Sequence, residues 1–97
     1  MTVRYSRTAL KQLSDILSFL DDRDGSVAAA AAKRIASIAT MLARRPSIGR
    51  PTDLKDVRVF RAAPYPYLIF YRQGEAGEIT ILRIRHTARA PHWRSGS

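Results

Sequence analysis

The chain has 97 residues, of which 45% are hydrophobic and 26% are charged, so it is excluded from the disordered class but has only a small core. Lys and Arg number 17 against 8 Asp and Glu, and this net charge of +9 predicts an anionic partner such as nucleic acid, a nucleic-acid enzyme or an acidic protein segment. The absence of cysteine excludes disulfides, a thiol nucleophile and cysteine metal ligands.

The first 21 residues predict a short strand and a helix. Residues 1–5 alternate as a strand does, and Ser6 then stands where an N-cap is needed. The helix behind it has an apolar stripe at spacings of three and four, formed by Leu10, Leu13, Leu17 and Leu20. Gly25 is predicted to end this helix and Ser26 to cap the next one.

The second helix is expected from about Val27 to Arg44. Its run of five alanines favours helix and permits close approach of a neighbour, and Pro46 prevents continuation. Residues 7–44 are therefore predicted to form an antiparallel helical hairpin.

The C-terminal half predicts a sheet. After a loop over residues 46–56, residues 57–86 hold three strand candidates separated by turn-forming residues, and residues 87–97 form a basic tail. The fold class is α+β, in the order β-α-α-β-β-β, with the helical hairpin packed on one face of a small antiparallel sheet. Residues 1–97 are expected to form a single domain.

The last strand is the main candidate for binding. Leu82 and Ile84 are predicted to point to one side of it, and Arg83 and Arg85 to the other. No acidic residue occurs from Ile79 to the C-terminus, so this strand and the tail should face something negative.

His86 and His92 are the only histidines, and acid–base catalysis on a phosphodiester would need one of them beside a cluster of cations. No carboxylate is placed to orient either one, and a histidine at a strand end is typically structural. We expect no cofactor and no metal, because the sequence has neither a ligand set nor a glycine-rich phosphate loop. Trp93 is expected to pack back onto the domain, with anchoring of a partner as the alternative.

The sequence shows no signal peptide and no apolar run near the ~20 residues that span a bilayer, so we expect a cytoplasmic protein.

The helical hairpin and four segments that follow it in order resemble the RelE/ParE superfamily of bacterial type II toxins, most closely the ParE branch. The four segments are Pro46-Ser-Ile-Gly-Arg-Pro51, Val57-Arg-Val-Phe-Arg61, Tyr67-Leu-Ile-Phe-Tyr-Arg72 and Ile81-Leu-Arg-Ile-Arg-His-Thr-Ala-Arg89. The resemblance implies a toxin in a hetero-oligomer with a small ParD-like antitoxin, whose acidic C-terminal segment lays a helix on the helical hairpin and an extended piece along the sheet.

The resemblance also implies a target. ParE-branch toxins poison DNA gyrase without being hydrolases, whereas RelE-branch toxins are ribosome-dependent mRNA endoribonucleases; the first is the expectation here and the second the alternative. The residues predicted to bind antitoxin or target are Arg58, Arg83, Arg85, His86, Arg89, Trp93, Leu13, Leu17 and Ile38. If the chain cleaves RNA, the candidates are Arg58, Arg61, Arg83, His86 and His92.

Overall fold

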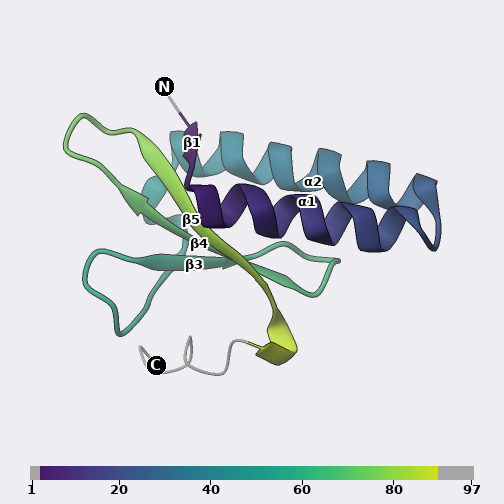
Figure 1. Ribbon diagram of the computed structural model, residues 1–97. Helices are drawn as coiled ribbons and strands as arrows, with labels where there is room; N and C mark the ends of the chain where they lie inside the picture. Colours follow the sequence, from purple (N-terminus) through teal and green to yellow (C-terminus); the bar gives the residue numbers. More distant parts are fainter. Residues whose placement is uncertain (1–2, 90–97) are drawn as a thin grey trace.

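A computed structural model describes residues 3–89, with Arg89 described by its backbone alone. A helical hairpin forms one layer and a sheet the other (Figure 1). In chain order the elements are β1 (Val3–Tyr5), α1 (Arg7–Asp21), α2 (Gly25–Arg44), the 3-10 turn η1 (Pro46–Ile48), β2 (Arg50–Pro51), β3 (Arg58–Arg61), β4 (Tyr67–Gln73), β5 (Ile79–His86) and the 3-10 turn η2 (Thr87–Arg89).

The described strands form one five-stranded sheet in the order β1-β5-β4-β3-β2. The predicted fold class is confirmed, with two corrections to the sheet. It is mixed rather than antiparallel, because β1 pairs with β5 in parallel. It also includes β2, a two-residue strand paired with β3 that is too short to show alternation in the sequence.

The ends of the two helices are held differently. At the start of α1, the Ser6 hydroxyl accepts a hydrogen bond from the Ala9 amide at 3.0 Å, which confirms the predicted N-cap. At the start of α2, the predicted boundary is wrong by two residues: Asp24 is the N-cap, and its carboxylate accepts from the Ser26 amide at 2.9 Å. Gly25 is therefore the first helical residue rather than a helix stop.

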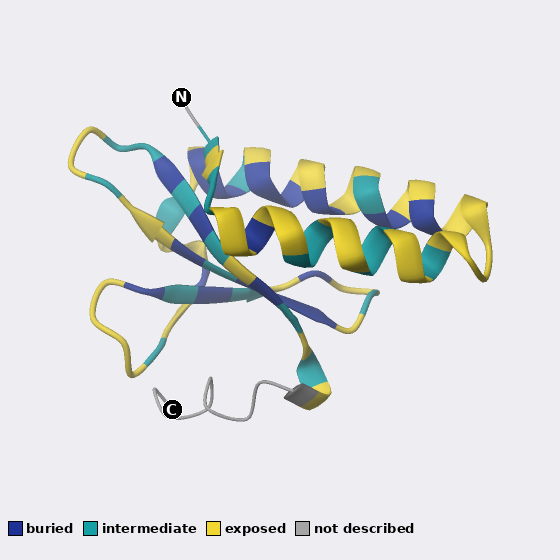
Figure 2. Ribbon diagram, viewed as in Figure 1, coloured by how far each residue is buried: buried dark blue, intermediate teal, exposed yellow. Residues whose placement is uncertain are grey.

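The core lies between the hairpin and the sheet, and the two helices contribute to it unequally (Figure 2). The buried residues of α2 are Ala28, Ala31, Ile35, Ile38, Ala39, Leu42 and Ala43. In α1, all of which is described, only Ala9 is buried. By length and composition alone α2 could cross a membrane, contrary to the expectation from the sequence, but its buried stripe is also that of a core helix.

A β-bulge in β5 decides which side chains reach the core. Phe70 pairs with Arg83 while the next residue of β4, Tyr71, pairs with Ile81, so Leu82 is the extra residue. The bulge lets Ile81 and Ile84 both face the helices and be buried, although they are three residues apart. The predicted strict alternation through Leu82 is therefore wrong, whereas the separation of Ile84 from Arg83 and Arg85 is confirmed.

Candidate functional site

The pairing of the strands divides the sheet into two chemically different sides. On the side under the hairpin, alternate residues of β4 and β5 belong to the main apolar core. In β4 these residues are Tyr67, Ile69 and Tyr71. On the other side, Val59 and Leu68 form a second small cluster against which Phe70 packs. This second side carries most of the arginines of the sheet.

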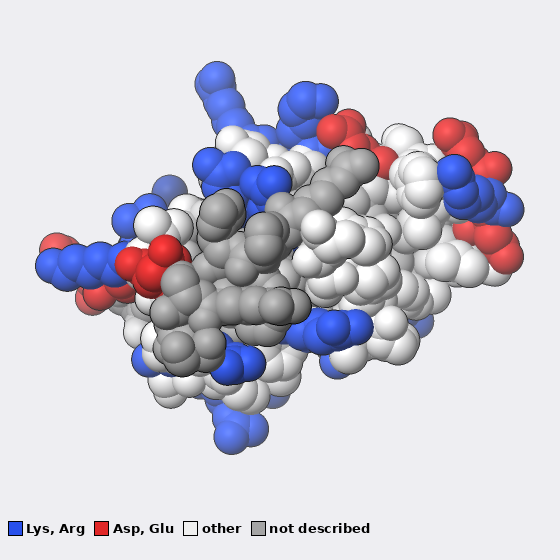
Figure 3. Space-filling view, turned by 90° about the horizontal axis from the view of Figure 1, so that it is seen from below, with Lys and Arg blue, Asp and Glu red and all other residues white. Residues whose placement is uncertain are grey.

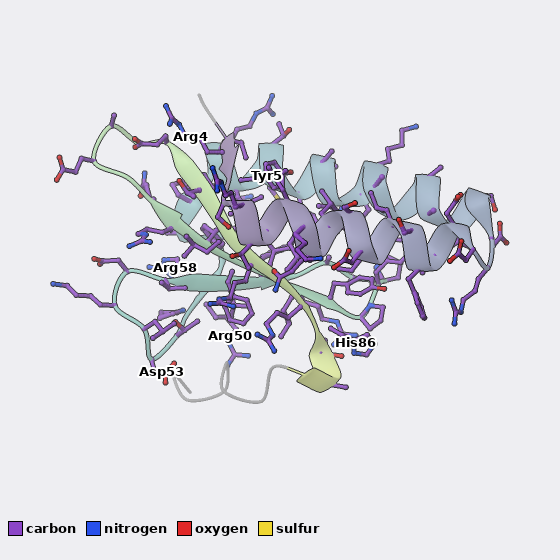
Figure 4. The ribbon with its side chains drawn as sticks, viewed as in Figure 1. Arg4, Tyr5, Arg50, Asp53, Arg58 and His86 are labelled. Atoms are coloured by element: carbon purple, nitrogen blue, oxygen red, sulfur yellow. The ribbon has the colours of Figure 1, made fainter. Side chains whose placement is uncertain are left out.

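We call this second side the arginine face and define it by three rows of paired positions that cross the strands. Each row has an apolar or hydroxyl residue at its centre and arginine on both flanks. The rows are Arg4–Thr80–Arg72, Arg83–Phe70–Val59–Arg50 and Arg85–Leu68–Arg61. Arg4 and Arg50 come from strands at opposite edges of the sheet, as Figure 4 shows.

Four arginines of this face have no carboxylate partner among the described residues. The ion pair that the structure shows joins Lys11 and Asp15 on α1, at 3.3 Å. The side chains of Arg4, Arg61, Arg72 and Arg83 are exposed and form no ion pair with a described carboxylate. Several Lys and Arg side chains are visible in the view from below (Figure 3). The described side chains that flank this face are therefore predominantly cationic.

Arg58, one of the residues predicted to bind antitoxin or target, does not lie on the arginine face with Arg83 and Arg85. It pairs with Tyr71, whose side chain lies in the core under the hairpin, so Arg58 lies on the other side of the sheet from Arg83. Its guanidinium donates to the carbonyls of Gly49 at 2.8 Å and Ser47 at 3.4 Å. Arg58 thus fastens the loop after α2.

Tyr71 completes this fastening. Its hydroxyl donates to the Pro46 carbonyl at 2.7 Å and accepts from the Gly49 amide at 2.8 Å. Burial raises the pKa of Tyr71, while the hydrogen bond from Gly49 and the charge of Arg58 act in the opposite direction. A Cβ at Gly49 would overlap the tyrosine ring, so this approach requires glycine.

His86 is placed as a structural histidine. Its ring stands edge-on to Tyr67, with ring centroids 5.8 Å apart, and its Nδ1 accepts a hydrogen bond from the Ala88 amide at 3.1 Å. It lies at the C-terminal end of β5, away from Arg58 (Figure 4). The strand partners of His86 and Arg58 are four residues apart on β4, roughly 13 Å along the strand.

The residues proposed for RNA cleavage are not brought onto one surface. Arg61 and Arg83 lie on the arginine face, whereas Arg58 and His86 pair with residues of the opposite side. His92, like Trp93, lies outside the described residues.

Of the helix residues predicted to contact the antitoxin or target, some are exposed to solvent and one is not. Leu13 and Leu17 are half-buried, so a partner can reach them, but Ile38 is 0% exposed and its prediction as a contact is wrong. Ile38 continues the stripe of α2 that packs into the core. The best exposed apolar residues of α1 are two that the prediction omitted, Leu10 at 53% and Phe19 at 51%.

The outer edge of β5 is closed by side chains where β1 ends. Ser6 donates from its hydroxyl to the Leu82 carbonyl at 2.8 Å, and Gln12 accepts from the Ile84 amide at 2.7 Å. Beyond Gln12 a groove of about 260 Å³ separates α1 from the end of β5 and includes Ile16 and His86 in its lining. Arg89 follows in η2, where its side chain is not described.

The fold and these surfaces define a small α+β domain with a half-covered helix and a cationic sheet. A family model described as the ParE toxin of the type II toxin–antitoxin system parDE matches residues 3–91. The relative "Putative toxin Y4kP" of Sinorhizobium fredii is 32% identical over 84 residues, which cover 87% of this chain and 85% of the relative.

The structural comparison agrees. A solved chain of the "Chromosomal ParDE TA system from P. aeruginosa" superposes with a TM-score of 0.76 at 26% identity, covering 89% of this chain and 95% of that one. The chain belongs to the ParE toxin family of type II toxin–antitoxin systems, as its sequence predicted.

Proposed function

We propose that the protein is a cytoplasmic toxin that is neutralised by a ParD-type antitoxin and poisons DNA gyrase by binding it rather than by catalysing a reaction. Membership of the ParE family carries this proposal. The placement of the histidine supports the non-enzymatic part, because Nδ1 of His86 is used in a turn and no described carboxylate forms an ion pair with this ring.

The antitoxin site that we propose is the outer stripe of α1. Leu10, Leu13 and Leu17 are spaced for one helix face, and each keeps apolar surface exposed to solvent. An amphipathic partner helix would bury this surface, which the protein's own core leaves uncovered. The net charge of +9 favours an acidic antitoxin segment.

The proposed target is tested with the purified chain, freed of antitoxin, in a DNA gyrase supercoiling assay beside translating ribosomes with a labelled message. We expect blocked supercoiling or trapped gyrase–DNA breaks, intact message, and recovery of supercoiling when the antitoxin is added back. His86→Ala should inhibit gyrase as the natural chain does. Cleaved message with active gyrase would instead make the protein a RelE-type ribonuclease.

A further inference from the structure

We propose that the arginine face is a binding site for single-stranded nucleic acid, separate from the antitoxin stripe on α1. The inference goes beyond gyrase binding and requires only this chain and a polynucleotide. It rests on the arrangement of arginine around an apolar centre on one side of the sheet.

The width of the site suits one strand. The arginines that flank the first and third rows, Arg4 with Arg72 and Arg61 with Arg85, are each two strands apart, so their backbones are about 10 Å from one another. Along β5, Arg83 and Arg85 are about 7 Å apart, being two residues of one strand. The flanks of the middle row, Arg83 and Arg50, are three strands apart, about 14 Å. The rows therefore form a strip about 10–14 Å wide with arginine on both sides.

The centre of the strip has an aromatic ring. Phe70 lies in the middle row between Arg83 and Val59 and is half-buried, so part of its ring is accessible. Sites for single-stranded nucleic acid combine a positive groove along the phosphates with aromatic rings against which bases stack. Phe70 with its flanking arginines provides both components.

A strand of phosphates fits this face better than an acidic protein segment does. Extended peptides bind sheets by adding to a free strand edge, but β4 is paired on both sides, with β5 and β3. Only side chains are therefore offered at the centre of the face. Arginine recognises phosphate through side-chain contacts alone, by paired hydrogen bonds from its planar guanidinium.

The test is fluorescence anisotropy of a fluorescein-labelled 20-nucleotide oligo(dT), titrated with the full antitoxin-free chain at a series of salt concentrations. We expect saturable binding that weakens linearly in a plot of log Kd against log salt. Arg61→Gln/Arg83→Gln should weaken binding on the order of tenfold at low salt. The same variant should lower the salt slope by about 1.4, since each phosphate contact on a single strand contributes about 0.7.

Two further variants sharpen the test. Arg23→Gln/Lys33→Gln removes the same charge from exposed positions on the helical hairpin and should leave the slope unchanged. Phe70→Leu keeps an apolar side chain but removes the ring, and should weaken binding about tenfold with little change in slope. Arg72→Gln/Arg85→Gln serves as a second face variant if circular dichroism shows that the first is misfolded.

Four results would overturn the proposal. The first is absence of saturable binding at 50 mM salt, and the second is equal losses in the face and hairpin variants. The third is tighter binding of a 20-base-pair duplex than of the single strand. The fourth is displacement of the oligonucleotide by a short poly-glutamate peptide at lower concentration than by unlabelled oligo(dT), which would assign the face to an acidic protein. None of these results bears on gyrase inhibition, which is measured separately.

Discussion

The two helices of the hairpin have similar apolar stripes but different burial. In α2 the stripe is buried along most of its length, and its alanines let the helix lie close to its neighbours. In α1 the stripe packs against both α2 and β5, beside an edge that β1 covers for only three residues, and much of it stays partly exposed. The periodicity of an apolar stripe therefore identifies a helix, but it does not tell whether the stripe is buried in the core or exposed to a partner.

Replacing the core side of α2 should have the largest effect on stability. Ile38→Ala removes a completely buried side chain, so we expect the free energy of unfolding to fall by about 2–5 kcal/mol in urea denaturation. Leu10→Ala on α1 is the matched change and should cost less than about 0.5 kcal/mol. Equal losses of unfolding free energy in the two variants would contradict the assignment of α2 to the core and of the α1 stripe to the surface.

Charging the α1 stripe should affect antitoxin binding instead. Leu10→Glu/Leu17→Glu places two anions where we propose an acidic, amphipathic segment docks, and we expect a loss on the order of 2 kcal/mol, about thirtyfold in Kd, by calorimetry. The melting temperature of the free toxin should change little. Ala29→Glu/Ser37→Glu, on the exposed side of α2, is the control and should bind as the natural chain does. Unaltered binding by the α1 variant would place the antitoxin elsewhere.

The loop that follows α2 can be tested at Tyr71. Tyr71→Phe leaves the Gly49 amide and the Pro46 carbonyl without their partner, which should cost about 1–3 kcal/mol. Because the folded state raises the pKa of Tyr71, the natural chain should lose stability as the pH rises above about 10, where the unfolded tyrosine ionises first. The variant should lose less between pH 8 and pH 11. A parallel pH profile would mean that Tyr71 does not contribute.

The N-caps allow a finer comparison of the helices. Ser6→Ala removes the α1 cap and the hydrogen bond to Leu82, and should destabilise the fold by about 1–2 kcal/mol in thermal unfolding. Ser14→Ala, an exposed position of α1, should be neutral. A neutral Ser6→Ala would show that β5 does not depend on this contact.

The α2 cap should show the smallest effect, and mainly at low pH. Hydrogen bonds from the side chain and amide of Ser26 lower the pKa of Asp24, so its contribution is present above the ordinary carboxyl pKa of about 4 and is lost as the pH falls further. Asp24→Asn keeps a capping side chain but cannot titrate. Its melting temperature should match the natural chain at pH 7 and fall less steeply between pH 5 and pH 2; an unchanged acid profile would contradict this.

Elements with a regular apolar pattern were predictable from the sequence. Features that depend on how one strand pairs with another were not. The hairpin and the three C-terminal strands follow from periodicity, and Ser6 was identified from its residue type. The position of Arg58 was not predictable, because side-chain alternation does not tell which side of β3 meets the hairpin. The roles of Arg4 and Arg72 were missed because a three-residue parallel strand leaves its pairing partner open. Leu10 could have been found as the first residue of the α1 stripe.

The extra residue at Leu82 has a consequence for comparing relatives of this protein. It shifts the alternation of side chains along β5 by one residue. Odd-numbered residues face the core before Leu82, and even-numbered residues face the core after it. A relative that lacks one residue here would form a regular ladder with the counterparts of Arg83 and Arg85 still on the outer side, whereas a relative that keeps the residue without the bulge would turn them beneath the helices. Alignments of β5 are therefore best anchored separately at Ile79 and at Ile84, with any gap placed between them.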